Sequence, residues 1–149
     1  MKRFICDRYG QEYQLVVHED SDDFFSAELR YRGEWIGKIE CKFDLPDIMV
    51  VEDLEIRNDS DSEPAFHRMR AKSNPINYRG RGLGTALLGL AVTSAKGKGV
   101  KHIYGSIVQK DINKTPNIVE FYERRGFKKV AHYPGCLANA VAYICMVLS

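Results

Sequence analysis

The segment Tyr78–Gly84, YRGRGLG, brings three glycines and two arginines together directly before a run of helix-forming residues. The first backbone N–H groups of a helix have no partner within the helix, and the helix dipole adds partial positive charge there. Glycines allow this backbone to approach a phosphate closely, while Arg79 and Arg81 add fixed positive charge. Thr85, in the first helical turn, adds a hydroxyl donor. The segment therefore predicts a site for an anionic ligand.

Three known phosphate-binding patterns compete for this segment. The P-loop pattern GxxxxGK[ST] is absent, because neither Gly-Lys-Ser nor Gly-Lys-Thr occurs in the chain. The dinucleotide pattern GxGxxG fails because Thr85 stands where its last glycine belongs, and no acidic residue lies about 20 residues further on. The remaining pattern, [Q/R]-x-x-G-x-[G/A], matches residues 79–84.

The charges of the chain are divided along its length. Residues 1–66 have a net charge of −9 and residues 67–149 a net charge of +11, which together give the overall +2. No Asp or Glu occurs from Ala71 to Lys110, and the glycine segment lies inside this window. A solvated basic surface is one interpretation, but the glycine segment favours an anionic ligand.

The elements that position this segment follow from hydrophobic periodicity and from turn residues. A strand is followed by a long polar loop, which has a short helical turn near Phe66–Ala71. The loop leads into the glycine segment, and an amphipathic helix follows that segment. A β-hairpin is expected through Arg32-Gly33. The predicted strands are 12–19, 24–31, 34–43, 48–56, 101–109, 127–133 and 141–149; the predicted loop is 57–77, and the predicted helices are 84–99 and 115–126. The order β-β-β-β-α-β-α-β-β predicts a mixed α+β fold in a single domain, residues 1–149.

The composition is typical of one soluble globular domain, with 149 residues, 44% of them apolar and 28% charged. No segment has the length and apolar character of a membrane helix or signal peptide, so we expect a cytoplasmic protein without a membrane partner. The four cysteines lie far apart without a CxxC pair. Buried free thiols, with Cys41 and Cys145 in strands, are therefore favoured over disulfides or a metal site.

A second motif lies some forty residues after the first. The segment EFYERRGFKKV, residues 120–130, has the spacing Phe-Tyr-x-x-x-Gly-Phe after a helix-start signal at Thr115 and Pro116. With the glycine segment, it resembles the two signature motifs of the GNAT superfamily of N-acetyltransferases, which use acetyl-coenzyme A. The resemblance covers residues 48–148.

The resemblance implies where the coenzyme binds. In this family the strands that correspond to 48–56 and 101–109 splay apart, and the pantetheine arm pairs with the opened backbone. The expected coenzyme-binding residues are Leu54, Ile56, Arg79, Arg81, Gly82, Leu83, Gly84 and Thr85, with Asn113 or Asn117 supplying an amide contact.

The resemblance also implies direct acyl transfer to an amine. Tyr122 matches the family's tyrosine, which protonates the leaving thiolate; packing alone is the alternative role. Glu52 is the expected general base, with Asp53 and Glu55 as alternatives, because a bulge in this strand makes the alternation of side chains unreliable. Solvation of a sheet edge is the other interpretation of these carboxylates. Single histidines such as His102 are interpreted as structural.

Two departures from the family leave the acceptor open. The segment HEDSDD leaves no room for the two helices that usually build the acceptor pocket, and the 57–77 loop can replace that wall or can be mobile. Thr115 and Ile118 stand where the family has Asn and Ala. The leading hypothesis is an N-acetyltransferase for a small-molecule or peptide primary amine, and the alternative is a non-catalytic coenzyme A-binding module. Nucleic acid is disfavoured because aromatic and basic residues are not interleaved; monomer and homodimer both stay open.

Overall fold

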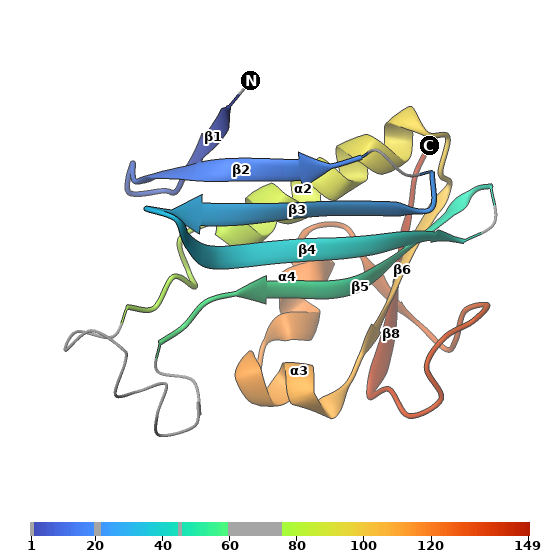
Figure 1. The fold of residues 1–149 in the computed structure, drawn as a ribbon. Coiled ribbons are helices and arrows are strands. Elements are labelled where there is room, and N and C mark those ends of the chain that lie inside the picture. Colours follow the sequence, from blue (N-terminus) through green and yellow to red (C-terminus); the bar gives the residue numbers. More distant parts are fainter. Residues whose placement is uncertain (1, 20–21, 45, 60–75) are drawn as a thin grey trace.

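A computed structural model describes residues 2–19, 22–44, 46–59 and 76–149. Eight strands form one sheet in the order β1-β2-β3-β4-β5-β6-β8-β7 (Figure 1). Neighbouring strands are antiparallel except for β5 and β6. The strands are β1 Arg3–Cys6, β2 Glu12–His18, β3 Phe24–Tyr31, β4 Glu34–Asp44, β5 Ile48–Ile56, β6 His102–Ile107, β7 Lys128–Val130 and β8 Ala142–Val147; the helices are α2 Leu83–Gly97, α3 Gln109–Lys114 and α4 Ile118–Arg124.

The β3–β4 hairpin forms where the alternating pattern predicts it. Phe25, Ala27 and Leu29 point to the buried face of β3, and their neighbours are more exposed. Arg32 and Gly33 have φ angles of 52° and 80°, the left-handed conformation that a two-residue hairpin turn requires. The expected hairpin is therefore confirmed.

Helix α2 covers one face of the sheet and closes the core. It packs against β3, β4 and β5, and it lies behind the sheet in the view of Figure 1. Leu83, Leu87 and Ala91 recur at helical spacing and are almost completely buried. Ile39, Met49 and Ile103 of the sheet belong to the same buried core, each with no exposed surface.

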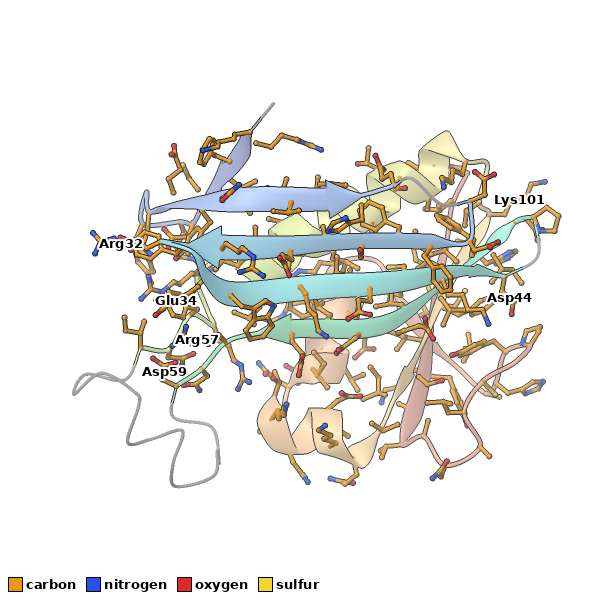
Figure 2. All side chains as sticks on the ribbon, in the orientation of Figure 1. Arg32, Glu34, Asp44, Arg57, Asp59 and Lys101 are labelled. Carbon is orange, nitrogen blue, oxygen red and sulfur yellow. The ribbon has the colours of Figure 1, made fainter. Side chains whose placement is uncertain are left out.

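The chain enters the glycine segment through a small paired structure beside the end of β5. Asp59 and Ile76 exchange two hydrogen bonds: the N–H of Asp59 donates to the carbonyl of Ile76 at 2.9 Å, and the N–H of Ile76 donates to Asp59 Oδ2 at 3.0 Å. The backbone carbonyl of Arg57 accepts the N–H of Tyr78 at 3.0 Å. The guanidinium of Arg57 forms ion pairs with Asp59 and Glu34 at 2.6 and 3.2 Å (Figure 2). These contacts hold the start of the glycine segment against the sheet. The helical turn predicted near residues 66–71 lies outside the described residues.

Three elements differ from the prediction. β1 was not predicted because this edge strand is largely exposed and shows no apolar alternation. α3 was also not predicted; Asp111 starts it by accepting the N–H of Val108 at 2.9 Å, and Thr115 ends it by donating its N–H to the Asp111 carbonyl at 2.9 Å. Because Thr115 ends α3, it does not cap the next helix, and α4 begins at Ile118 instead.

Only residues 19–23 separate β2 from β3, so the expected absence of two helices at this point is confirmed by the strand boundaries. In the described part of the chain, no helix covers the front of β2–β5 in the view of Figure 1. None of the described helices is long and apolar enough to cross a membrane. The described cysteines are all free thiols, and Cys41 and Cys145 are buried as predicted.

Candidate active site

The parallel strands β5 and β6 lie side by side only at their beginnings. Their pairing runs from Ile48 with His102 to Val51 with Gly105 and then stops. Beyond this point β5 stays paired with β4, and β6 stays paired with β8. The two strands therefore separate, which confirms the predicted splayed pair.

A cavity of about 140 Å³ lies in the gap between the separated strands. Its walls come from β5, from the end of β6, and from α3 and α4. The predicted catalytic residues Glu52 and Tyr122 both line it, 70 positions apart in the sequence. Its other lining residues are Val51, Asp53, Leu54, Glu55, Ile56, Arg79, Ser106, Ile107, Lys110, Asp111, Lys114, Thr115 and Ile118.

A bulge in β5 sets the direction of its three carboxylates. In the pairing with β4, Glu40 faces Asp53 and Cys41 faces Val51, so Glu52 is the extra residue. Residues that face one another across paired strands share one side of the sheet. Asp53 therefore lies on the side of the exposed Glu40, whereas Glu52 stands at the point where β5 leaves β6.

Among the described residues, lysines form ion pairs with Asp53 and Glu55 but not with Glu52. Lys38 Nζ lies 3.4 Å from Asp53 Oδ2 and 4.0 Å from Glu55 Oε2, and Lys114 Nζ lies 3.1 Å from Glu55 Oε1. Burial raises the pKa of Asp53, the nearby Glu55 raises it further, and Lys38 opposes both. No residue in the described ranges forms an ion pair with Glu52. Of the three β5 carboxylates at the cavity, Glu52 is therefore the one that no described cation neutralises.

Tyr122 reaches the cavity from α4 and is 5% exposed. Its ring packs edge-on against Phe121 and Phe127, with centroid distances of 5.3 and 5.2 Å. Burial raises the pKa of the Tyr122 phenol above its usual value of 10.0, and neighbouring acidic groups add to the effect. No hydrogen bond from another described side chain or backbone group engages this phenol. Tyr122 is thus a protonated donor facing the cavity.

A second, larger cavity of about 520 Å³ opens over the start of α2, and we call it the basic groove. Among the described residues, five cationic side chains and no carboxylate line it. It shares Leu54, Ile56, Arg79, Lys114, Thr115 and Ile118 with the first cavity, so the two are adjacent. Its lining also includes Arg8, Asn58, Asn77, Tyr78, Gly80, Gly82, Leu83, Gly84, Thr85, Pro116, Asn117, Phe121, Arg124 and Arg125.

The start of α2 is left open toward the basic groove. Gly82 precedes the helix with a φ of 85°, and no side chain caps the helix. The first turn contains no acidic residue. A side chain at Gly84 would place its Cβ 3.3 Å from the ring of Phe121, so glycine avoids a tight contact with this ring in the groove wall. Backbone N–H groups arranged in this way suit an anionic ligand.

Two predicted contact residues lie elsewhere. The guanidinium of Arg81 lies 3.4 Å from Asp7 Oδ2 and over the Tyr78 ring at 5.2 Å, outside the lining of both cavities. The structure therefore places the charge of Arg81 against a buried carboxylate and not in the lining of either cavity. Asn113 accepts a hydrogen bond from Gln109 at 3.0 Å on an exposed surface, also outside both linings. Asn117 lines the basic groove.

Arg125 is a groove residue that the sequence reasoning missed. Its Nε donates to Thr85 Oγ1 at 2.8 Å, and its Nη1 donates to the Phe121 carbonyl at 2.7 Å. Its guanidinium also lies 3.9 Å from the centre of the Phe121 ring. Arg125 thus joins the end of α4 to the first turn of α2, and the Thr85 hydroxyl keeps its own proton to donate. Its position directly before Gly126 in the second motif was the available signal.

Comparisons with known proteins agree with this geometry. A model of the acetyltransferase (GNAT) family matches residues 76–127, which include both motifs. An uncharacterized N-acetyltransferase of Methanocaldococcus jannaschii is 27% identical over 119 residues, which cover 78% of this chain. The match spans 44% of the length of that relative.

Solved structures share the fold. The GNAT domain of S. lividans PAT superposes with a TM-score of 0.69 at 12% identity, covering 99% of this chain and 97% of that one. The PaiA N-acetyltransferase from Thermoplasma acidophilum, in complex with coenzyme A, superposes with a TM-score of 0.59 at 16% identity, covering 85% and 62% of the two chains. The mixed sheet with its splayed parallel pair is the fold of the GNAT acetyltransferases. The segment that holds both motifs thus matches the GNAT family model, and the fold of the chain is similar to that of GNAT acetyltransferases.

Proposed function

We propose that this protein is an acetyl-coenzyme A-dependent N-acetyltransferase that acts on a primary amine. The observation that supports this most strongly is the composition of the cavity between β5 and β6. It combines the unpaired carboxylate of Glu52 with the protonated phenol of Tyr122, and it adjoins a groove lined by cations. A base, an acid and an anion site side by side are the parts that acyl transfer from an anionic coenzyme requires.

The residues of the basic groove fit the phosphates of the coenzyme. The open start of α2 offers backbone N–H groups, Thr85 offers a hydroxyl, and five cations line the groove. Two of these cations also form ion pairs, Lys114 with Glu55 and Arg124 with Glu120. Leu54 and Ile56 lie on the stretch of β5 that β6 does not pair, where an extended arm can bind as an added strand. Bound acetyl-coenzyme A supplies an activated acetyl group as a thioester.

Glu52 and Tyr122 have complementary roles in this proposal. The amine must be deprotonated before it attacks, and Glu52 takes that proton, directly or through a water molecule. Tyr122 gives its proton to the leaving sulfur. Its raised pKa keeps the phenol protonated at neutral pH, which is the state that a general acid needs. Asp53 and Glu55 are less suited to act as the base because Lys38 and Lys114 hold their charges.

The test is incubation of the purified protein with acetyl-coenzyme A and a panel of primary amines, ranging from small amines to lysine-containing peptides. Release of free thiol is followed with a thiol-reactive dye, and the acetylated product is identified by mass spectrometry. We expect amine-dependent thiol release. Tight coenzyme A binding without turnover on any amine would instead support a non-catalytic binding module. Binding of nucleic acid that coenzyme A does not displace would contradict both.

A further inference from the structure

We propose that the turn between β1 and β2, residues 7–10, is part of the phosphate site: Arg8 binds a phosphate of the coenzyme and Asp7 positions the glycine segment. This inference rests on the proposed function, because the site in question is the basic groove. It concerns a hairpin whose first strand the sequence did not predict, and it assigns to this hairpin a role in binding.

Asp7 is a buried carboxylate that joins the turn to the glycine segment. Its side chain has no exposed surface. Oδ1 accepts the N–H groups of Tyr9 and Gln11 at 2.9 and 3.0 Å, while Oδ2 accepts the Tyr13 hydroxyl at 2.8 Å and faces Arg81 Nη1 at 3.4 Å. Asp7 thus fixes the shape of its own turn and holds the side chain of the residue directly before Gly82.

The backbone forms a second link between the same two segments. The N–H of Arg8 donates to the Arg81 carbonyl at 3.0 Å. The turn closes with the N–H of Gly10 donating to the Asp7 carbonyl at 3.1 Å, and Gly10 has a φ of 87°. The turn and the glycine segment therefore contact each other through both side chains and backbone, and the position of one determines the position of the other.

Arg8 supplies the charge that Arg81 cannot. Asp7 neutralises Arg81 and holds it outside the groove, whereas the exposed side chain of Arg8 lines the groove. No carboxylate in the described part of the chain pairs with Arg8. A guanidinium of this kind, free of an internal partner and beside an open helix start, is suited to a phosphate.

The experiment compares Arg8→Gln with Arg3→Gln, using calorimetric titration with coenzyme A, dephospho-coenzyme A and pantetheine. Arg3 is an exposed arginine of the same hairpin that lines neither cavity, so its substitution controls for the loss of one positive charge. We expect Arg8→Gln to raise the Kd for coenzyme A by about tenfold relative to Arg3→Gln, as the loss of one charged contact implies. Pantetheine, which has no phosphate, should bind all three proteins equally.

Dephospho-coenzyme A identifies the phosphate. An equal loss for both coenzymes assigns Arg8 to the diphosphate, and a loss confined to coenzyme A assigns it to the ribose phosphate. If Arg8→Gln binds coenzyme A as Arg3→Gln does, or loses pantetheine equally, the inference is wrong while the proposed function stands. If the wild-type protein binds no coenzyme A, the proposed function and this inference both fail.

Asp7→Asn tests the positioning role. Measured well below the melting temperature, where the variant is folded, its Kd for coenzyme A should rise several-fold while its Kd for pantetheine stays constant. A purely structural role would lower the melting temperature and leave the coenzyme A Kd of the folded protein unchanged, and that result would overturn the positioning role of Asp7.

Discussion

Replacement of Asp7 by Asn should destabilise the fold by an amount that the local contacts allow us to estimate. The amide keeps one oxygen, which can still accept the N–H groups of Tyr9 and Gln11. Its NH₂ group cannot accept the hydroxyl of Tyr13, and it presents donors to the Arg81 guanidinium. A hydrogen bond to a charged group contributes about 1.5–3 kcal/mol. The contact at 3.4 Å to Arg81 is long and adds less, so we expect a loss of about 2–3 kcal/mol.

Thermal unfolding followed by circular dichroism measures this loss. For a chain of this size, each kcal/mol lowers Tm by about 2–4 °C, so Asp7→Asn should melt about 5–10 °C below the wild type at pH 7. Asp22→Asn is the control, because Asp22 is exposed and forms no ion pair with any other described residue. A Tm decrease no larger than that of Asp22→Asn would refute the estimate.

The pH dependence gives a second test of the same contacts. Burial by itself would raise the pKa of Asp7, but the hydrogen bonds from Tyr13, Gln11 and Tyr9 outweigh it and lower the pKa below the usual 3.8. A lowered pKa in the folded state means that the stabilisation is complete above about pH 4 and is lost as the pH falls through the folded-state pKa. The Tm difference between wild type and Asp7→Asn should therefore be constant from pH 7 to 5 and should shrink below that range. A difference that grows in acid would contradict the assigned contacts.

Three further predictions concern the active site. Tyr122→Phe should lower kcat about 100-fold without changing the Kd for coenzyme A, and an unchanged kcat would reject the acid role. Because the pKa of Tyr122 is raised, wild-type turnover should show no loss from ionisation of this phenol below pH 10. Glu52→Gln should abolish most thiol release, whereas Glu55→Gln, at a carboxylate already paired with lysines, should retain it; equal losses would count against Glu52 as the base. Gly82→Ala should lose about 1–2 kcal/mol of stability from its φ of 85° and bind coenzyme A more weakly, while Gly89→Ala, in open space within α2, should melt at or above the wild-type temperature.

Local sequence patterns predicted the helices and strands whose formation depends mainly on neighbouring residues. The period-two alternation of residues 24–31 and 34–43 and the turn at Arg32-Gly33 gave the hairpin, and β5 occupies the predicted residues 48–56. α2 was found because its apolar side chains recur every three to four residues after a glycine-rich start. The missed elements, β1 and α3, are short and mostly exposed, so they have no apolar period to detect.

The arrangement of the site depended on contacts that no local pattern encodes. The alternation of side chains along β5 does not determine which of Glu52, Asp53 and Glu55 faces the cavity unpaired. That depends on where the pairing of β5 with β4 shifts by one residue. The charge of Arg81 was assigned to the ligand because its partner Asp7 lies 74 positions away. The position of Arg8 depends on the same kind of contact, since only the docking of the β1–β2 turn brings it to the groove.

By itself the sequence determined which residues are available for chemistry: a glycine segment before a helix, a tyrosine in a second motif and a group of carboxylates on one strand. These are properties of neighbouring residues, and backbone sterics and side-chain periodicity act over a few residues at a time. Only the tertiary structure decided which carboxylate faces the cavity, which arginine is neutralised and which one lines the groove. Those outcomes depend on strand register and on ion pairs between distant segments, and both are established only when the sheet and α2 pack together.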